Sequence, residues 1–305
     1  MENVIINPED YTSKYIAYLN KCFKNWGQKD VYDWVFKRTV GGLDSDIILI
    51  KDNEGEIIAG SGVTYRKLNT EQAGLIDIAI MTGSWTLPKA RGKGCFTTMI
   101  EVSKEVAANK GVAFLTAFVT ESNASFRRLE RAGSYLVSTY HLFSPDEQYN
   151  APNLLNVEEV SLDEFTIDKV YNRLNSFKVL AHFAYTRHEF KEQYIDRPIS
   201  PIILKINTEY VLIEETHNVM KVLLLTSPDD QSQLIGIVKS LTNWSLRNYA
   251  KKLLLFTTDT NIKGVCEELK FENLPGHFTV LNTTAIGTDI LKPFLGLAIN
   301  SGDKI

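Results

Sequence analysis

The spacing of apolar and polar residues predicts an alternation of strands and helices along the first half of the chain. Apolar residues recur at helical spacing in Tyr11–Phe23, Asp30–Thr39, Gly94–Lys110 and Asn123–Ala132. Extended apolar runs indicate strands at Val4–Asn7, Asp46–Asp52, Glu56–Leu68, Leu75–Leu87, Val112–Thr120 and Tyr135–Phe143. The expected order is therefore strand, two helices, three strands, helix, strand, helix and strand.

The second half shows a similar order of elements. Strands are expected at Leu154–Val160, Pro201–Ile206, Tyr210–Glu214, Val219–Thr226, Leu253–Thr258 and His277–Leu281. Helices are expected at Leu162–Asn175, Glu189–Tyr194, Gln231–Lys252 and Ile262–Leu269. TESN at Thr120–Asn123 recurs as TDTN at Thr258–Asn261, an offset of 261 − 123 = 138 residues. We interpret this as a tandem duplication with a junction at Pro152–Leu154; two unrelated α/β units are the alternative.

Composition fits a globular chain of two domains, which we expect at residues 1–150 and 151–305. Of the 305 residues, 44% are hydrophobic and 23% are charged, and the net charge is −4. A weakly acidic chain lacks the broad positive field of nucleic-acid-binding proteins. No apolar run reaches the roughly 18 residues of a membrane span, and the N-terminus has no signal-peptide pattern. Three widely spaced cysteines favour free thiols in the cytoplasm. The oligomeric state is not indicated.

The segment RGKGCF, Arg91–Phe96, has the composition of an anion-binding loop. It lies between an expected strand and an expected helix, whose first N–H groups have no internal partners and carry the positive end of the dipole. Two glycines allow close approach of a phosphate, and Arg91 and Lys93 add positive charge. Thr97 breaks a dinucleotide fingerprint, and Gly94 breaks a P-loop because serine or threonine is needed after the lysine. A basic surface turn is the alternative.

The longer segment LPKARGKGCF resembles the pyrophosphate loop of the GNAT-type N-acetyltransferases, R/Q-x-x-G-x-G/A. Arg91 and Gly94 match this pattern, whereas Phe96 replaces the final small residue. Thr120–Ser134 is similar to the family segment N-x-A-S-x-x-x-L-E-x-x-G. The resemblance covers residues 1–145. It implies an α/β (α+β) fold with a GNAT-like mixed, mostly antiparallel sheet flanked by helices, followed by a second GNAT-like domain that lacks the pyrophosphate loop.

The resemblance also implies where a cofactor binds. In this family the fourth and fifth strands diverge, and the pantetheine arm of acetyl-CoA lies in the gap. Ser84, Trp85 and Thr86 are expected to offer main-chain groups to that arm. Asn123 is expected to contact the cofactor, although alignment on Gly133 places Ser122 at the family asparagine. The diphosphate is expected to bind main-chain N–H groups of Arg91, Gly92, Lys93, Gly94, Cys95, Phe96 and Thr97.

The catalytic residues are less clearly indicated. Acyl transfer to an alkyl amine requires its deprotonation, which costs roughly 4 kcal/mol at pH 7. Many family members use a tyrosine that corresponds to Leu129 and some a glutamate that corresponds to Ala117, and neither side chain can serve. We expect Asp77, Glu121 or Tyr140 to act as the acid or base; structural roles are the alternative for each.

Three other features have ordinary structural explanations. Cys95, beside two cations at a helix start, could act as a nucleophile, but direct acyl transfer is the family route and packing is expected. The five histidines show no metal-ligand spacing, so no metal site is expected. The polar and aromatic segment Tyr185–Phe190 could line a substrate surface, although a helix start is the favoured interpretation.

The second half differs where the loop should recur. It reads TSPDDQSQL at Thr226–Leu234, and the carboxylates of Asp229 and Asp230 would repel a diphosphate. We therefore expect one cofactor site. The hypothesis is a cytoplasmic N-acetyltransferase that transfers an acetyl group from acetyl-CoA to a small-molecule or peptide amine, with no nucleic-acid or membrane partner. A non-catalytic acyl-CoA sensor is the alternative, and an adaptor whose second half binds a protein is a third hypothesis.

Overall fold

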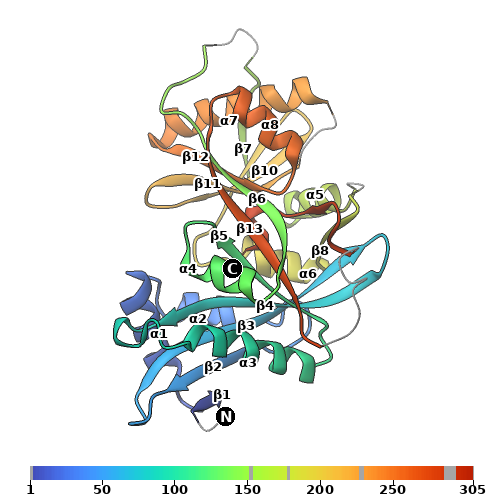
Figure 1. The fold of residues 1–305 in the computed structure, drawn as a ribbon. Helices are drawn as coiled ribbons and strands as arrows, with labels where there is room; N and C mark the ends of the chain where they lie inside the picture. Colours follow the sequence, from blue (N-terminus) through green and yellow to red (C-terminus); the bar gives the residue numbers. More distant parts are fainter. Residues whose placement is uncertain (1–2, 151–153, 177–178, 227–229, 285–292, 305) are drawn as a thin grey trace. The chain divides into compact units, whose positions relative to one another are not determined.

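A computed structural model describes residues 3–150, 154–176, 179–226, 230–284 and 293–304 (Figure 1). The chain forms two compact units. The first unit comprises Met1–Val137 and Phe278–Leu295, and the second comprises Ser138–His277 and Gly296–Lys304. The unit boundaries therefore fall within two strands, β6 (Tyr135–Phe143) and β13 (Glu272–Asn282).

The first unit is a mixed sheet with helices on both faces. Its helices are α1 (Thr12–Phe23), α2 (Lys29–Phe36), α3 (Cys95–Asn109) and α4 (Ala124–Arg131). Its strands are β1 (Val4–Ile6), β2 (Asp46–Lys51), β3 (Ile57–Thr70), β4 (Gly74–Thr86) and β5 (Phe114–Thr120), in the order β1-β2-β3-β4-β5. The pairs from β1 to β4 are antiparallel, and β4 and β5 are parallel. Each of these helices and strands was expected from the sequence.

Successive residues of β2 alternate between two apolar cores. Ile47 and Leu49 join the cluster formed with α1 and α2, whereas Ile48 and Ile50 join the cluster formed with α3. Because side chains of a strand point alternately to opposite faces, a strand covered on both sides is apolar at every position. The continuous apolar run in DIILIK follows from this double burial.

The second unit has a comparable order of elements. Its helices are α5 (Glu164–Asn175), α6 (Arg187–Phe190), the π-turn η2 (Lys191–Ile195), α7 (Gln231–Tyr249), α8 (Thr260–Glu268) and the 3₁₀ turn η4 (Ser301–Asp303). Its strands include β7 (Glu158–Val160), β8 (Ala181–Ala184), β9 (Ile202–Ile206), β10 (Glu209–Glu215), β11 (Val219–Leu225), β12 (Lys252–Thr257) and β14 (Leu297–Ala298). Its strand order is β7-β9-β10-β11-β12-β6. As in the first unit, antiparallel pairs, here from β7 to β11, are followed by one parallel pair, β11 with β12. Strands β12 and β6 are antiparallel.

Several expectations for the second half need correction. The strand expected over Leu154–Val160 is β7, which begins only at Glu158, and the short β8 and β14 were not expected. The helix expected over Gln231–Lys252 ends at Tyr249, because Ala250 adopts the left-handed conformation with φ of 52°. Lys252 then pairs with Val219 as the first residue of β12.

Each unit completes its sheet with a strand from the other half of the sequence. The residues of β6 from Tyr140 to Phe143 pair with β12 in the second unit. The last part of β13 lies beside β5 in the first unit, where the Thr279 hydroxyl donates to the Ala117 carbonyl at 3.2 Å. The compact units therefore do not coincide with the expected division at residue 150. The expected junction at Pro152–Leu154 lies largely outside the described residues.

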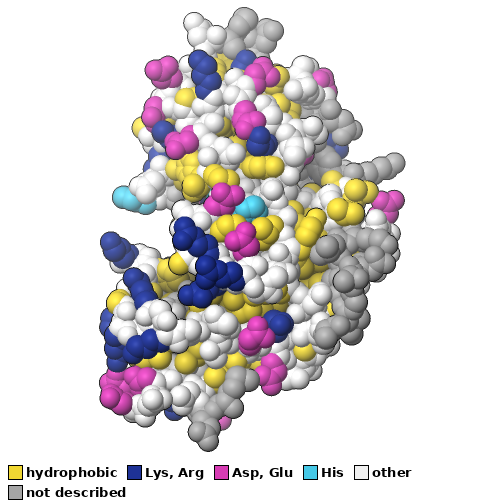
Figure 2. Space-filling model, viewed as in Figure 1, with side chains coloured by type: hydrophobic (Ala, Val, Ile, Leu, Met, Phe, Trp, Pro, Cys, Tyr) yellow, Lys and Arg dark blue, Asp and Glu magenta, His cyan; other side chains and the backbone are white. Residues whose placement is uncertain are grey.

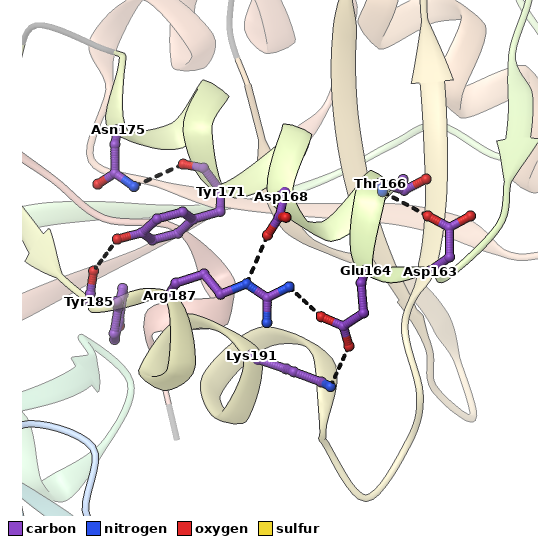
Figure 3. A network of polar contacts seen from close by, with 9 residues as sticks. All are labelled: Asp163, Glu164, Thr166, Asp168, Tyr171, Asn175, Tyr185, Arg187 and Lys191. Atoms are coloured by element: carbon purple, nitrogen blue, oxygen red, sulfur yellow. Dashed lines mark hydrogen bonds and ion pairs between the residues drawn. The ribbon is translucent and has the colours of Figure 1, made fainter.

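The segment Tyr185–Phe190 forms a helix start in the second unit (Figure 3). Thr186 caps α6 through a reciprocal capping box. Arg187 donates to Glu164 and, at 2.8 Å, to Asp168, so it links α6 to α5. These charges are partly exposed, and each pair therefore contributes little stability. The polar composition of the segment is explained by capping and by this link between helices.

Candidate functional site

Strand β4 departs from β5 at an irregularity in its own backbone. The two strands pair at Ile78–Ile80 with Phe114–Thr116, and no further pair between them is found in the described residues. On the other side of β4, Thr82 is opposite Gly62 but Trp85 is opposite Gly60, so β4 carries one extra residue. Such a bulge bends a strand and interrupts its ladder. The bulge thus coincides with the part of β4 that has left β5.

The residues at the bulge offer main chain, not side chains, to a ligand. Gly83 has φ of +57°, a conformation that favours glycine. The hydroxyl of Ser84 lies 2.7 Å from that of Ser61 on β3. The Trp85 side chain is buried and stacks on Tyr18 with ring centroids 4.7 Å apart. Because these side chains are engaged, a molecule between β4 and β5 would meet the backbone of β4.

The start of α3 presents N–H groups that have no acceptor. Gly94 is the N-cap residue, with φ of +84°, and it has no side chain with which to cap the helix. The first intrahelical bond is donated by the Thr98 N–H to the Gly94 carbonyl at 3.1 Å. Within the described residues, no acceptor is found for the N–H groups of Gly94, Cys95, Phe96 and Thr97. Such an exposed helix start is a binding site for anions.

The loop before α3 leaves room for a ligand. Gly92 also has a positive φ of +81°, and a Cβ atom at Gly92 or Gly94 would meet nothing within 4 Å. Positive φ at alternate residues turns successive N–H groups toward one side of the loop, as in phosphate-binding nests. The side chains of Arg91 and Lys93 are exposed, and no ion pair to them is found in the part of the chain that is described. The loop therefore combines free amides, free cations and open space.

Further cations lie on α4. Arg127, Arg128 and Arg131 are exposed, and Figure 2 shows Lys and Arg side chains gathered over the position of α4. Asn123 is the N-cap residue of α4, yet its side chain makes no capping hydrogen bond. The Asn123 side chain is therefore not committed to capping α4, and its expected contact with a cofactor stays a prediction.

A hollow of about 900 Å³ lies beside the first residues of α3 and is lined by Lys89, Lys93 and Cys95. It is also lined by Asp52 and Glu54 from the turn between β2 and β3. These carboxylates oppose a second anion. The hollow is therefore an unfavourable site for an anion.

Comparisons with known proteins give fold similarity without sequence similarity. No family model matches the chain, and no curated protein matches it. A tandem GNAT protein from the clavulanic acid biosynthesis pathway is 12% identical with a TM-score of 0.63, covering 93% of this chain and 100% of that one. A putative acetyltransferase from Pyrococcus horikoshii is 12% identical with a TM-score of 0.59, covering 97% and 95%. This chain has a GNAT-type fold.

A third structure of similar fold was solved with a long-chain acyl-CoA bound. N-myristoyltransferase from Saccharomyces cerevisiae, solved with bound myristoyl-CoA, is 10% identical with a TM-score of 0.64. The match covers 92% of this chain and 79% of that one. The expected GNAT-like sheet, followed by a second GNAT-like domain, is confirmed. At these identities the comparisons establish the fold alone.

Within the GNAT-type fold, Cys95 and Phe96 have packing roles. Cys95 is 6% exposed, belongs to the core cluster of α3 and lies with its Sγ 3.8 Å from the Ala90 carbonyl. Phe96 packs against the same cluster. The departure of Phe96 from the family pattern therefore has a packing explanation, because its ring lies on the core. Burial also argues against Cys95 as a nucleophile.

The three acid–base candidates are not brought together by contacts that the structure shows. Asp77 forms an ion pair of 2.7 Å with Lys67 across the β3–β4 ladder, before the bulge. Glu121 is exposed directly after β5. Tyr140 belongs to the second unit, where it packs on the core and the Lys263 ammonium lies 5.4 Å from its ring centroid. Their catalytic roles stay predictions.

Two residues at expected catalytic positions are buried and apolar. Leu129 is 1% exposed and Ala117 is 5% exposed, and both belong to the core of the first unit. No proton donor or acceptor is therefore supplied by these two positions.

In the described residues, no group of three or more His, Cys, Asp and Glu side chains is placed to hold a metal ion. No described helix has the length and apolarity needed to cross a membrane.

The second GNAT-like domain has the same strand geometry but a different helix start. In β11, Leu224 is opposite Leu212 while Val222 is opposite Ile213, so this strand also carries one extra residue. It pairs with β12 over Val219–Lys221 only, as far as the described residues show. At the start of α7, Asp230 accepts from the Ser232 N–H at 2.8 Å. Asp229 lies outside the described residues.

The bulge in β4 and the capping role of Asp230 were missed by sequence reasoning. A glycine inside an extended pattern, here Gly83, is a known signal for a bulge. Asp followed two residues later by Ser at a helix start, as in Asp230 and Ser232, is a capping signal. From the sequence, Asp230 is expected to repel phosphate through its charge. In the structure its carboxylate is also already bound by its own helix.

Proposed function

We propose that this chain is an acyltransferase that transfers an acetyl group from acetyl-CoA to an amine. The observation that carries the proposal is the uncapped start of α3, which directly follows a strand that bulges and leaves its parallel neighbour. A thioester attached to a diphosphate through a long arm needs both features. The amides fit the diphosphate, and the separated strands fit the arm.

The proposed donor contacts come mainly from the backbone. The N–H groups of Gly94, Cys95, Phe96 and Thr97 would donate to diphosphate oxygens, and each hydrogen bond to a charged group contributes roughly 1.5–3 kcal/mol before costs. Arg91, Gly92 and Lys93 complete the loop. The main chain of Ser84, Trp85 and Thr86 would bind the pantetheine arm, and the Asn123 side chain would add one contact.

The proposed acceptor is a primary amine on a small molecule or a peptide. Its ammonium must lose a proton before it attacks a thioester, so a positioned base or a water chain is required. Glu121 is the candidate in the first unit that is exposed and close in sequence to the end of β5. Asp77 is the other candidate in this unit, and Lys67 already holds its carboxylate.

Free cysteines are consistent with the proposed cytoplasmic location. Cys22, Cys95 and Cys266 form no disulfide in the structure. Reducing compartments maintain cysteines in this form.

A non-catalytic acyl-CoA sensor is the second candidate function. The observation that favours it is the burial of Leu129 and Ala117, which leaves two positions without an acid or base. A sensor would bind the thioester as tightly as an enzyme but would not turn it over.

Two measurements separate these functions. Calorimetry with acetyl-CoA tests binding, and we expect saturable binding to one site per chain. Release of free thiol is then followed with a panel of amines that includes diamines, amino sugars and peptides. Turnover with any amine above the rate of hydrolysis supports the enzyme. Binding without turnover across the panel supports the sensor, and absence of binding contradicts both.

A further inference from the structure

Two glycines of β3 leave one face of the sheet without side chains beside the bulge. The register places Gly62 opposite Ile47 of β2. It places Gly60 opposite Leu49. Ile47 and Leu49 belong to the core formed with α1 and α2, so both glycines face these helices as well. On the other side of β3, Gly62 is opposite Thr82 of β4, directly before the bulge. The glycines therefore form a recess beside the place where β4 leaves β5.

Two aromatic rings fill this recess. A Cβ atom on Gly62 would lie 2.2 Å from Cε1 of Phe36, and one on Gly60 would lie 2.7 Å from the ring of Trp85. Carbon atoms in contact are about 3.5–4.0 Å apart, so the rings leave no room for even one added carbon. Both rings are buried. Each also meets the Tyr15 ring edge to face, with centroids 5.7 Å and 6.1 Å apart, so neighbouring side chains hold them in place.

The bulge is covered on the same face. A Cβ atom on Gly83 would lie 3.4 Å from Cδ2 of Leu19 on α1 and 3.5 Å from Cζ of Phe36 on α2. Leu19 and Phe36 are both buried. A single carbon at the bulge would therefore already be in van der Waals contact with both side chains. Phe36 takes part in both places, because it fills the recess at Gly62 and covers Gly83.

The space between β4 and β5 is bounded on its other sides too. Met81 of β4 and Ala117 of β5 belong to the core cluster of α3, together with Met99 of that helix. All three are buried. The last pair that the described residues show between the two strands is Ile80 with Thr116, so the gap ends there. A group at this end of the gap meets packed side chains toward either face of the sheet.

We propose that Leu19 and Phe36 limit the acyl donor to short acyl groups such as acetyl. The inference rests on the proposed function, in which the arm of the donor lies between β4 and β5 and carries its thioester toward the closed end of the gap. The methyl of an acetyl group needs little space. A chain of several methylenes must displace a packed side chain, which well-packed cores resist. Phe36 decides the space toward α1 and α2, because the glycines below it contribute no side chain.

The first test compares acyl donors on the unaltered protein. Calorimetry measures the affinities of CoA, acetyl-CoA and hexanoyl-CoA. We expect acetyl-CoA to bind at least as tightly as CoA, and hexanoyl-CoA to bind at least about tenfold more weakly than acetyl-CoA, because its extra methylenes overpack the site. Hexanoyl-CoA that binds as tightly as acetyl-CoA, or more tightly, overturns this inference and leaves the proposed function standing. Absence of binding by all three ligands overturns the proposed function and this inference with it.

Variants of the two side chains test their roles. Phe36→Ala removes the ring over Gly62 and should raise the affinity for hexanoyl-CoA relative to acetyl-CoA by at least about tenfold. Leu19→Ala removes less of the cover over the bulge and should raise this ratio by about threefold. Tyr32→Ala is the matched control, because Tyr32 is a buried ring one turn earlier on α2 and is not among the side chains nearest to the glycines at the bulge. Its ratio should equal that of the unaltered protein.

Affinity for CoA itself shows that each variant is folded. Where Phe36→Ala does not bind CoA, Phe36→Leu takes its place, because leucine keeps more of the core volume and still shortens the side chain over the recess. An unchanged ratio in the Phe36 variant, or an equal rise in Tyr32→Ala, overturns the proposal. The comparison of donors on the unaltered protein needs no variant and decides the question even if all variants misfold.

Discussion

The starts of α3 and α7 differ although the strands before them are alike. Both β4 and β11 carry one extra residue, and each pairs with its parallel neighbour over three residues. Helix α3 begins after Gly94, which cannot cap it, so its amides are exposed. Helix α7 begins after Asp230, whose carboxylate accepts from the first turn.

This difference shows where the proposed binding function is encoded. If divergent strands alone sufficed to bind acyl-CoA, both units would bind it. An N-cap carboxylate occupies the donors that a diphosphate needs and adds a negative charge in the same place. The choice between glycine and aspartate at one position therefore separates a proposed anion site from a closed helix end.

The largest expected effect comes from putting an acidic side chain at the open helix start. Gly94→Glu should weaken acetyl-CoA binding by at least about a hundredfold, about 2.7 kcal/mol, because the carboxylate repels the diphosphate and competes for the amides. Calorimetry measures the change. Gly111→Glu is the matched control, since Gly111 has φ of +76° and open space at the other end of α3. Equal losses in both variants would indicate backbone strain and not loss of a site.

A smaller effect is expected from the loop cations. Arg91→Ala and Lys93→Ala should each weaken binding by roughly threefold to tenfold, because an exposed cation adds modest attraction that salt screens. The loss should shrink as sodium chloride is raised, and this is measured by titration at two salt concentrations. Lys89→Ala serves as the control, because Lys89 is already paired with Glu56. Affinity that is unchanged in both loop variants argues against diphosphate binding at this loop.

Removing the N-cap of α7 is expected to lower the stability of the protein and to leave its affinity for acetyl-CoA unchanged. Asp230→Ala removes the N-cap acceptor of α7 and should lower the thermal midpoint by a few degrees, as loss of a cap does in domains of this size. Acetyl-CoA affinity should stay the same. Differential scanning fluorimetry and calorimetry check the two parts. A new acetyl-CoA site in this variant would show that the cap alone closes the second domain.

The smallest expected effect is the pH dependence of that cap. Hydrogen bonds from the Ser232 side chain, and then from its N–H, lower the pKa of Asp230 below the ordinary 3.8. A carboxyl with a lowered folded-state pKa stabilises the fold above its unfolded pKa, and this stabilisation is lost as pH falls through the folded value. The difference between wild type and Asp230→Ala should therefore be full at pH 6 and shrink below about pH 3.8. Urea unfolding of both proteins at pH 6 and below about pH 3.8 measures this difference in the free energy of unfolding. The same difference at the two pH values would contradict a cap that depends on the Asp230 charge.

The sequence predicted the elements of the first unit because their apolar patterns are strong. DIILIK is a continuous apolar run and the segment from Gly94 to Lys110 has a helical period, and both formed as expected. The loop at Arg91–Phe96 stays a predicted anion site, and the structure shows at Gly94 the uncapped helix start on which that prediction depends. In contrast, β7 was overextended, because Leu155 and Val157 are apolar but pack on the core outside the strand.

Other features depend on long-range contacts that no local pattern encodes. The exchange of β6 and β13 between the units pairs residues far apart in sequence, such as Thr279 with Ala117. The contact of Lys304 with His141 is of the same kind, since 163 residues separate them. The catalytic base has no local sequence signal either, because a side chain acts as a base only when the fold places it beside the reacting amine.

Hydrogen exchange at the two helix starts tests the central claim most directly. The N–H groups of Gly94, Cys95, Phe96 and Thr97 have no acceptor in the described structure and should exchange quickly in the free protein. Saturating acetyl-CoA should slow their exchange strongly, while exchange at Ser232 and the rest of the first turn of α7 stays the same. Unchanged exchange at the start of α3 in the presence of bound acetyl-CoA, or equal protection of α7, would contradict the account.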